Sequence, residues 1–109
     1  MKKVIHTDNA PKAVGPYSQA IEANGMLFIS GQIPVVPATG EIVSADVEEQ
    51  TKQCLENLKA VLAAAEMTLD NVVKTSVFIK NMDDFGKING VYAQYFQENC
   101  PARACVEVA

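Results

Sequence analysis

The sequence predicts a single α+β domain, a sandwich in which two helices cover one face of a mixed β-sheet. Three observations predict this class: a hairpin signal at Asn24-Gly25, two segments with helical spacing of apolar residues, and β-branched or alternating segments on both sides of the second helix. The chain of 109 residues has the length of one domain and contains no repeat, linker or low-complexity segment. We therefore expect one domain over residues 1–109.

The composition is that of a globular protein, with 49% hydrophobic and 20% charged residues. A net charge of -4 and a pI near 4.8 provide no basic surface for phosphate backbones, which argues against nucleic acid as a main partner. No apolar run reaches the length that spans a bilayer, so we expect no membrane insertion.

The cysteines indicate a reducing compartment. Cys54, Cys100 and Cys105 are odd in number and widely spaced, and the Met-Lys-Lys-Val start has no secretion signal. The sequence therefore predicts a cytoplasmic protein without disulfides. With His6 as its one histidine and no Cys-x-x-Cys pair, it also offers no recognisable metal site.

The amino-terminal third predicts a short strand and a hairpin. Residues 3–6 form the first expected strand, and a loop leads from there to Gly15-Pro16. Segments 17–22 and 26–30 flank Asn24-Gly25, a strong short-range hairpin signal. Ser30-Gly31 ends the second strand of the hairpin, where a glycine permits a bend or a close backbone approach, and marks a candidate binding edge.

A proline-containing loop and a long helix follow. Residues 32–45 form the loop, with a possible short strand at 41–43. Asp46 and Glu49 have the spacing of a helix-capping box. The apolar residues that follow with helical spacing are Val47, Cys54, Leu55, Leu58, Val61, Leu62 and Ala65. We expect this helix to cover the sheet, with Cys54 as a small buried hydrophobic side chain.

The next segments predict an interior strand and a second helix. The strand covers residues 72–79, which are rich in β-branched side chains, and residues 81–84 cap the helix. The apolar stripe of this helix consists of Phe85, Ile88, Tyr92, Tyr95 and Phe96. Asn89 falls on the polar side, where solvation or capping is the expected role and a ligand contact is the minority alternative.

The final segment, residues 101–109, has the alternation of a strand. One face carries Ala104, Val106 and Val108, which we expect to meet the core, and the more polar face carries Arg103, Cys105 and Glu107. An arginine at a strand entrance is suited to hold a small anion through its bidentate fork. A surface ion pair is the alternative, and from the strand alone it is the more frequent outcome. The sheet face away from the helices needs cover, which favours self-association.

Four segments of the chain together resemble the Rid (YjgF) family, the reactive-intermediate deaminases that hydrolyse enamines and imines. They are Gly15-Pro16-Tyr17-Ser18-Gln19-Ala20, Ser30-Gly31-Gln32-Ile33-Pro34, Ile88-Asn89-Gly90-Val91-Tyr92 and Pro101-Ala102-Arg103-Ala104-Cys105-Val106-Glu107-Val108-Ala109. Each segment alone is a weak signal. Their order and spacing along one short chain carry the resemblance, which runs from end to end.

The resemblance implies a chorismate-mutase-like fold and a homotrimer with clefts between subunits for small 2-imino or 2-keto acids. It implies that Arg103 is the catalytic residue that binds the substrate carboxylate. The other residues implied to contact the substrate are Tyr17, Ser30, Gly31, Asn89 and Cys105. The implied reaction converts 2-aminoacrylate or 2-aminocrotonate to pyruvate or 2-ketobutyrate and ammonia without a cofactor.

Physically, this reaction needs a carboxylate anchor, an apolar-walled site and polar groups that orient water toward the C2 carbon. We interpret Cys105 as a pocket wall, because no histidine can be assigned beside it to activate a nucleophile. A separate hypothesis is that Arg103 makes this thiol sensitive to oxidation or alkylation. Members of the family continue with a further strand carrying a glutamate that positions water. The sequence stops at Ala109, and Glu107 does not take that place.

Two other functions remain as alternatives. The first is an endoribonuclease or translation inhibitor, a name that some relatives carry, although this chain is acidic and has no recognisable pair of catalytic bases. The second is a non-catalytic trimer that binds small 2-keto acids. The absent glutamate favours this second alternative.

Overall fold

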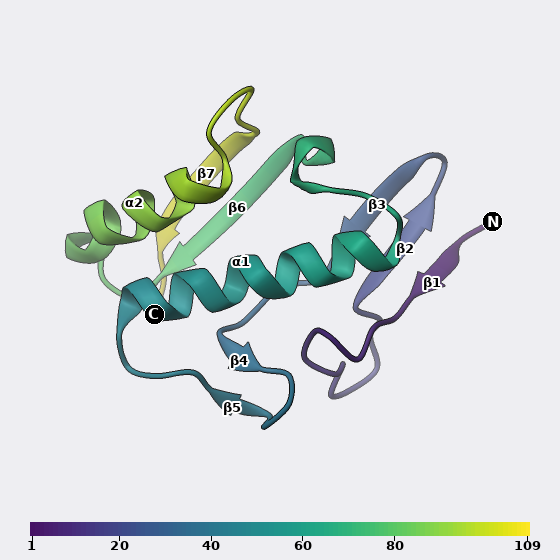
Figure 1. Cartoon of the computed structure of the whole chain (residues 1–109), viewed down its shortest axis with the longest axis horizontal. Helices are drawn as coiled ribbons and strands as arrows, with labels where there is room; N and C mark the ends of the chain where they lie inside the picture. The colour runs from purple at the N-terminus through teal and green to yellow at the C-terminus, as the bar shows by residue number, and fades with distance from the viewer.

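The computed structural model describes all residues from 1 to 109, and its chain forms seven strands and two α-helices. The strands are β1 (Lys3–Ile5), β2 (Ala20–Ala23), β3 (Met26–Ile29), β4 (Val35–Val36), β5 (Glu41–Ile42), β6 (Lys74–Ile79) and β7 (Ala102–Glu107). The helices are α1 (Val47–Ala64) and α2 (Phe85–Tyr95), with 3-10 turns at η1 (Leu69–Asn71) and η2 (Met82–Asp84). The predicted elements are all present, and β4 is a short addition that pairs with β5 (Figure 1).

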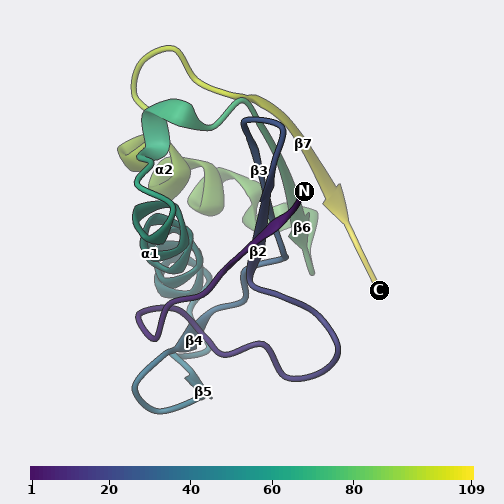
Figure 2. The same ribbon diagram turned by 90° about the vertical axis from the view of Figure 1, so that its right-hand side faces the viewer.

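The strands make three hydrogen-bonded groups, of which two are antiparallel and one is parallel. β1, β2 and β3 form an antiparallel sheet, β4 pairs with β5, and β6 pairs with β7 in parallel. The parallel pair requires a crossover, which α2 supplies. Both helices lie on the same side of strands β2, β3, β6 and β7 (Figure 2). The predicted α+β arrangement, with two helices on one face of mixed strands, is confirmed.

The hairpin between β2 and β3 turns at the predicted dipeptide. Asn24 has φ 52° and Gly25 has φ 74°, so both residues adopt the left-handed conformation that a two-residue type I′ turn requires. Ala23 pairs with Met26 directly beside the turn. Asparagine and glycine are the residues that adopt this conformation at the lowest cost, which is why the local sequence was sufficient to place the hairpin.

The cap of α1 differs from the predicted capping box in one contact. The Glu49 amide donates a 3.0 Å hydrogen bond to Asp46 Oδ2, as expected. The Glu49 carboxylate, however, accepts a 2.9 Å hydrogen bond from Ser44 Oγ, and Ser44 Oγ also accepts one from the Asp46 amide. Ser44 therefore replaces the reciprocal half of the box, and both orphan donors at the helix start are still satisfied.

The core consists of two clusters on the inner side of the helices. One contains Ile5, Ala10, Ala20 and Val61, and the other contains Leu55, Val91, Tyr92 and Phe96. Residues of α1 contribute to both clusters, so this helix joins the β1–β2–β3 sheet to the β6–α2–β7 unit. The predicted apolar stripe of α1 is confirmed at Leu55, Val61 and Leu62, which are all buried.

Asn57 is a buried polar residue that the hydrophobic pattern of α1 did not reveal. The residue is 1% exposed, its side-chain nitrogen donates to the carbonyl oxygens of Ile33 at 3.1 Å and Val35 at 2.9 Å, and its side-chain oxygen accepts a bond from Gln53. Buried polar groups are stable only when paired in this way. Asn57 therefore fastens the loop that follows Gly31 to the long helix.

The strand face that points away from the helices is apolar and uncovered. Phe28 is 57% exposed, Phe78 is 67% exposed and Val106 is 45% exposed. The prediction that Ala104, Val106 and Val108 meet the core is therefore wrong for this chain. The physical reason is that α2 covers the opposite face of β7, the one that carries Arg103.

Neither helix combines the length and the apolarity that a membrane crossing would require.

Candidate functional site

The clearest candidate site lies where β7 meets α2. Arg103 pairs with Thr75 in the parallel register, and its side chain extends over α2. The guanidinium Nη1 donates a 2.7 Å hydrogen bond to Asn89 Oδ1. The guanidinium carbon also lies 4.7 Å from the centre of the Tyr92 ring and 5.5 Å from that of Phe85. Arg103 is thus held by one hydrogen bond and two aromatic rings while remaining exposed to solvent.

The spacing of three residues along α2 explains this arrangement. Phe85, Asn89 and Tyr92 are separated by four and then three positions, so they share one face of the helix. Asn89 is half-buried on this face, and the expectation that it lies on the polar side of the helix is wrong. A guanidinium stacks favourably on aromatic rings, and a carboxamide oxygen is a natural acceptor for one of its five N–H groups.

The remaining donors of Arg103 are available to an anion. The structure gives the guanidinium one hydrogen bond, to Asn89, and no ion pair with a carboxylate. The alternative, a surface ion pair of Arg103 with a carboxylate, is therefore not observed. An arginine held rigidly and left with free N–H groups is chemically suited to a carboxylate or another small planar anion.

Tyr92 is itself fixed beneath the guanidinium. Its hydroxyl is 2.8 Å from Thr75 Oγ1, its ring centre is 4.7 Å from that of Phe96, and its side chain is 9% exposed. Thr75 and Arg103 are partners in the β6–β7 pair, so the register of these two strands fixes where both residues lie relative to Tyr92. The packing of Tyr92 was expected, and its contact with Arg103 was not.

Cys105 and Glu107 follow Arg103 on the same face of β7, as the alternation predicted. Cys105 is half-buried, pairs with Val77 in the register and is a free thiol. Glu107 Oε1 accepts a 2.7 Å hydrogen bond from the Met82 amide at the start of η2. Glu107 is therefore engaged in capping a turn.

The other predicted site residues gather at a second place, beside the hairpin. Tyr17 and Ser30 line an open hollow of about 390 Å³, together with Ile21, Phe28 and Lys2. Ser30 Oγ donates a 2.6 Å hydrogen bond to the Ser18 carbonyl oxygen, and Tyr17 Oη accepts a 3.3 Å bond from the amide of Val14. Gly31 follows Ser30 directly and is exposed.

The six predicted residues thus form two groups. Arg103, Asn89 and Cys105 make up the arginine cluster, and Tyr17, Ser30 and Gly31 make up the tyrosine cluster. The side-chain hydrogen bonds of each cluster stay within it or run to neighbouring backbone, and none joins the two.

Other titratable groups lie outside these clusters. Burial raises the pKa of the Cys54 thiol to about 11, so this thiol stays protonated near neutral pH. Burial and the hydrogen bond to Glu56 raise the pKa of the Tyr95 hydroxyl to about 12. His6 lies on the surface, 3.1 Å from Asp8. No three His, Cys, Asp or Glu side chains converge in the way that a metal site requires.

Comparisons with known proteins establish the family. A family model described as Endoribonuclease L-PSP matches residues 7–109. A RutC family protein of Pyrococcus horikoshii is 59% identical over 109 residues, covering 100% of this chain and 86% of the relative. The crystal structure of a conserved Rid family protein from Yersinia pestis matches with a TM-score of 0.96 at 52% identity, covering 99% of this chain and 86% of that one. The chain belongs to the Rid (YjgF) family.

One relative of this Rid protein has a name that bears on chemistry. TdcF of Escherichia coli, named as a reactive intermediate deaminase, is 49% identical over 112 residues, covering 100% of this chain and 86% of the relative. A crystal structure of Escherichia coli TdcF with bound serine matches with a TM-score of 0.94 at 48% identity, covering 98% of this chain and 86% of that one. The resemblance carried by the four sequence segments is therefore confirmed at the level of the family.

Sequence reasoning missed the groups that hold Arg103 in this Rid protein. The aromatic rings of Phe85 and Tyr92 lie against its guanidinium, and Thr75 fixes the Tyr92 hydroxyl. The spacing of Phe85, Asn89 and Tyr92 was a usable signal, because it places an amide between two aromatic rings on one helix face. No sequence signal revealed Thr75, since its neighbours depend on the register of two strands that are far apart in the chain.

Proposed function

We propose that this protein catalyses the hydrolytic deamination of reactive 2-enamine and 2-imine acids, such as 2-aminoacrylate and 2-aminocrotonate, to 2-keto acids and ammonia. The observation that carries the proposal is the Arg103 guanidinium, held by Asn89 and Tyr92 with its other donors free. The name of TdcF as a reactive intermediate deaminase supports it. The three free cysteines support a reducing, cytoplasmic setting.

In this proposal Arg103 binds the substrate carboxylate through two parallel N–H···O bonds. Asn89 and the rings of Tyr92 and Phe85 restrict the rotation of the guanidinium, so little side-chain entropy is lost when the anion binds. Cys105 lies along the same strand face, about 6.7 Å further on by the rise of two strand residues, and forms an apolar wall next to the C2 carbon. A relative crystallised with serine, which carries a carboxylate, is consistent with such an anchor.

The proposed chemistry consumes one water molecule. The enamine first takes a proton at C3 and becomes the imine, and water then adds to C2 with formation of a C–O bond. Proton transfer to nitrogen and cleavage of the C–N bond release ammonia and leave the C2 carbonyl of the keto acid. The protein contributes mainly orientation of the bound substrate and water. The proposal assigns no cofactor and leaves Glu107 in its capping contact with the Met82 amide.

We further propose a homotrimer in which the arginine cluster of one subunit meets the tyrosine cluster of its neighbour. The apolar face that carries Phe28, Phe78 and Val106 supports self-association, because exposed apolar patches of this kind mark interfaces. Tyr17 would then contact the substrate across the cleft, with Ser30 and Gly31 lining it. Multi-angle light scattering tests the assembly, and a monomer at micromolar concentration would contradict the intersubunit site.

RNA cleavage is the second candidate function, because the matching family model is described as Endoribonuclease L-PSP. RNA cleavage by general acid-base catalysis needs a pair of titratable groups at the site that binds RNA, and the single histidine, His6, lies with Asp8 on the surface, outside both the arginine and the tyrosine clusters. The net charge of -4 also disfavours binding of the negatively charged RNA backbone. A third possibility is a trimer that binds 2-keto acids without turnover. The experiment below distinguishes all three.

The test generates the imine in situ with a serine or threonine dehydratase and measures the rate of keto-acid release. Three proteins are compared: this chain, Arg103→Ala and the matched control Lys87→Ala. Lys87 is an exposed cation on α2 outside both clusters. Deaminase function predicts acceleration by this chain and Lys87→Ala and none by Arg103→Ala.

Other outcomes of this test identify the alternatives. Binding of pyruvate by this chain and Lys87→Ala but not by Arg103→Ala, without acceleration by any of them, identifies the non-catalytic module. The same purified proteins are incubated with RNA, and cleavage that is lost in Arg103→Ala identifies the ribonuclease.

A further inference from the structure

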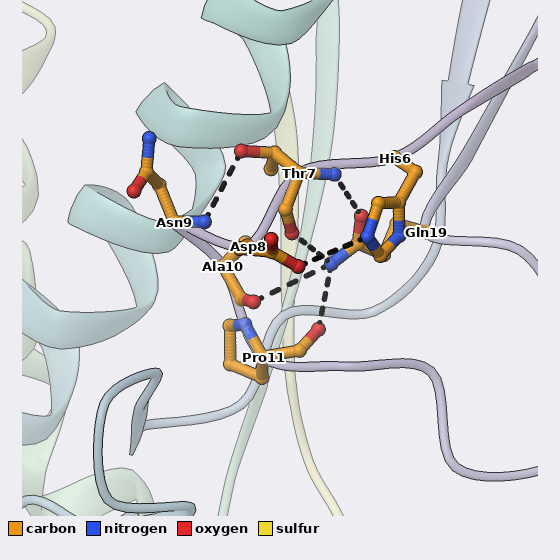
Figure 3. Close-up of polar contacts among 7 residues, drawn as sticks. All are labelled: His6, Thr7, Asp8, Asn9, Ala10, Pro11 and Gln19. Carbon is orange, nitrogen blue, oxygen red and sulfur yellow. Dashed lines mark hydrogen bonds and ion pairs between the residues drawn. The ribbon is translucent and has the colours of Figure 1, made fainter.

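A single buried glutamine organises the segment before the hairpin. Gln19 lies one residue before β2 and is 4% exposed. Its Oε1 accepts a 2.7 Å hydrogen bond from the Thr7 amide, and its Nε2 donates to the carbonyl oxygens of Thr7 at 3.0 Å and Pro11 at 2.9 Å. A longer contact of 3.4 Å reaches the carbonyl oxygen of Ala10 (Figure 3). Both the oxygen and the nitrogen of the amide thus have hydrogen-bond partners.

These contacts replace a missing piece of backbone pairing. The β1–β2 ladder ends where Ile5 pairs with Ala20. Beyond that point the Gln19 side chain bonds both the N–H and the C=O of Thr7, as a neighbouring strand would. The segment from Thr7 to Pro11 is therefore attached to the sheet by one side chain, which satisfies backbone groups that burial would otherwise leave unpaired.

The same residue closes the loop that carries Tyr17. Residues 12–18 run from Pro11, whose carbonyl oxygen is bound by the Gln19 side chain, to the Gln19 backbone itself. Within the loop, the Tyr17 hydroxyl accepts a bond from the Val14 amide, so the ring folds back over its own segment. One residue thus fixes both ends of the loop, and the place of Tyr17 depends on it.

Gln19 also binds Ser30, the residue that directly follows β3. Its backbone carbonyl oxygen accepts a 3.0 Å hydrogen bond from the Ser30 amide, and the preceding carbonyl, of Ser18, accepts the 2.6 Å bond from Ser30 Oγ. Ser30 is therefore tied to the same two residues that end the Tyr17 loop. Displacement of Gln19 would therefore move Tyr17 and Ser30, two of the three members of the tyrosine cluster, together.

We propose that Gln19 is a positioning residue for the tyrosine cluster, holding Tyr17 and Ser30 in the geometry that substrate binding and turnover require. This inference rests on the proposed function in assigning those two side chains to the substrate. A displacement of about 1 Å in a catalytic constellation can lower a rate by a factor of about 100. Glutamine suits the position because it offers a donor and an acceptor on a side chain long enough to reach Thr7 and Pro11.

The competing explanation is that Gln19 only stabilises the fold. Gln19→Met tests the two explanations, since methionine has a similar length and no amide. Val61→Ala is the matched control, because Val61 is 0% exposed in the same core cluster as Ala10 and Ala20, and its truncation lowers stability while it removes none of the groups that hydrogen-bond with the Gln19 side chain. Urea unfolding establishes the stability of both variants.

Two measurements decide between the explanations. The first is the rate of trypsin cleavage after Lys12, an exposed residue inside the loop, followed by mass spectrometry under native conditions. The second is kcat and KM for imine hydrolysis. We expect Gln19→Met to be cleaved at least tenfold faster after Lys12 than Val61→Ala, and to lose at least tenfold in kcat/KM relative to that control.

Either of two results would overturn the proposal: no excess cleavage of Gln19→Met over Val61→Ala, or excess cleavage with kcat/KM equal to that of the control. If the unmodified protein itself fails to accelerate imine hydrolysis, the proposed function fails, while the cleavage rates still decide whether Gln19 holds the loop. If Gln19→Met does not fold, Gln19→Asn, which keeps the amide on a shorter side chain, is measured against the same two outcomes.

Discussion

Arg103 of β7 donates a 2.7 Å hydrogen bond to Asn89 of α2, and this contact joins the last strand to the second helix at an exposed edge. The bond uses one of five guanidinium N–H groups, and the rings of Tyr92 and Phe85 hold the plane of the group. An arginine restrained in this manner has lost much of its rotational freedom before any anion binds. The arginine cluster is therefore pre-organised for a carboxylate.

Replacing Asn89 with aspartate should weaken substrate binding. In Asn89→Asp a carboxylate takes the place of the amide oxygen 2.7 Å from Nη1, so it pairs with the guanidinium and repels the substrate anion. We expect KM for imine hydrolysis to rise by roughly 10- to 100-fold, the range given by a charged hydrogen bond of about 1.5–3 kcal/mol. Asn89→Ser, which adds no charge, is the control, and an equal KM in the two variants would contradict the electrostatic explanation.

The contact between Thr75 and Tyr92 should contribute measurably to stability. Tyr92→Phe and Thr75→Val each remove one side of a 2.8 Å hydrogen bond, and each should lower the free energy of unfolding by about 1 kcal/mol. In a double-mutant cycle by urea unfolding, we expect a coupling energy of about 1 kcal/mol, and strictly additive effects would argue against the bond. Tyr92→Phe keeps the ring beneath Arg103 and should leave KM unchanged, whereas Tyr92→Leu should raise it.

The buried thiol of Cys54 should make the protein less stable at alkaline pH. Burial raises its pKa to about 11 in the folded chain, from 9.0 for a thiol in water. Below pH 9 both states keep the proton, and above it the unfolded state binds fewer protons, so the free energy of unfolding falls as pH rises toward 11. Urea unfolding at about pH 8 and about pH 10.5 should show that wild type loses about 2 kcal/mol more than Cys54→Ala. Parallel losses in the two proteins would exclude the thiol as the cause.

Ligand binding should protect Cys105 from alkylation. Cys105 is half-buried beside Arg103, whereas Cys100 is exposed and serves as an internal reference. If Cys105 forms the wall of the proposed pocket, saturating pyruvate should slow its reaction with iodoacetamide several-fold and leave the rate at Cys100 unchanged. Arg103→Ala should abolish the protection. Equal slowing at both thiols, measured by peptide mass spectrometry, would indicate a nonspecific effect of the keto acid.

Local features of this protein follow from local sequence. Asn24-Gly25 specifies the hairpin because both residues must adopt positive φ, and Asp46 starts α1 because its carboxylate satisfies an orphan amide in the first turn. The alternation along β7 correctly placed Arg103 and Cys105 on one face. Each of these conclusions concerns residues within a few positions of one another, where backbone conformation and side-chain period decide the outcome.

The surroundings of those residues depended on the assembled chain. Periodicity defines two faces of β7, but only the parallel register with β6 and the crossover through α2 decide that the Arg103 face meets a helix and the Val106 face stays open. The buried amides of Gln19 and Asn57 are likewise invisible to a hydrophobic pattern, because their partners are backbone carbonyl groups of loops. Contacts between distant segments are set by strand register and helix rotation, which local sequence patterns do not reveal, so only the tertiary structure showed which groups hold Arg103 and Tyr17.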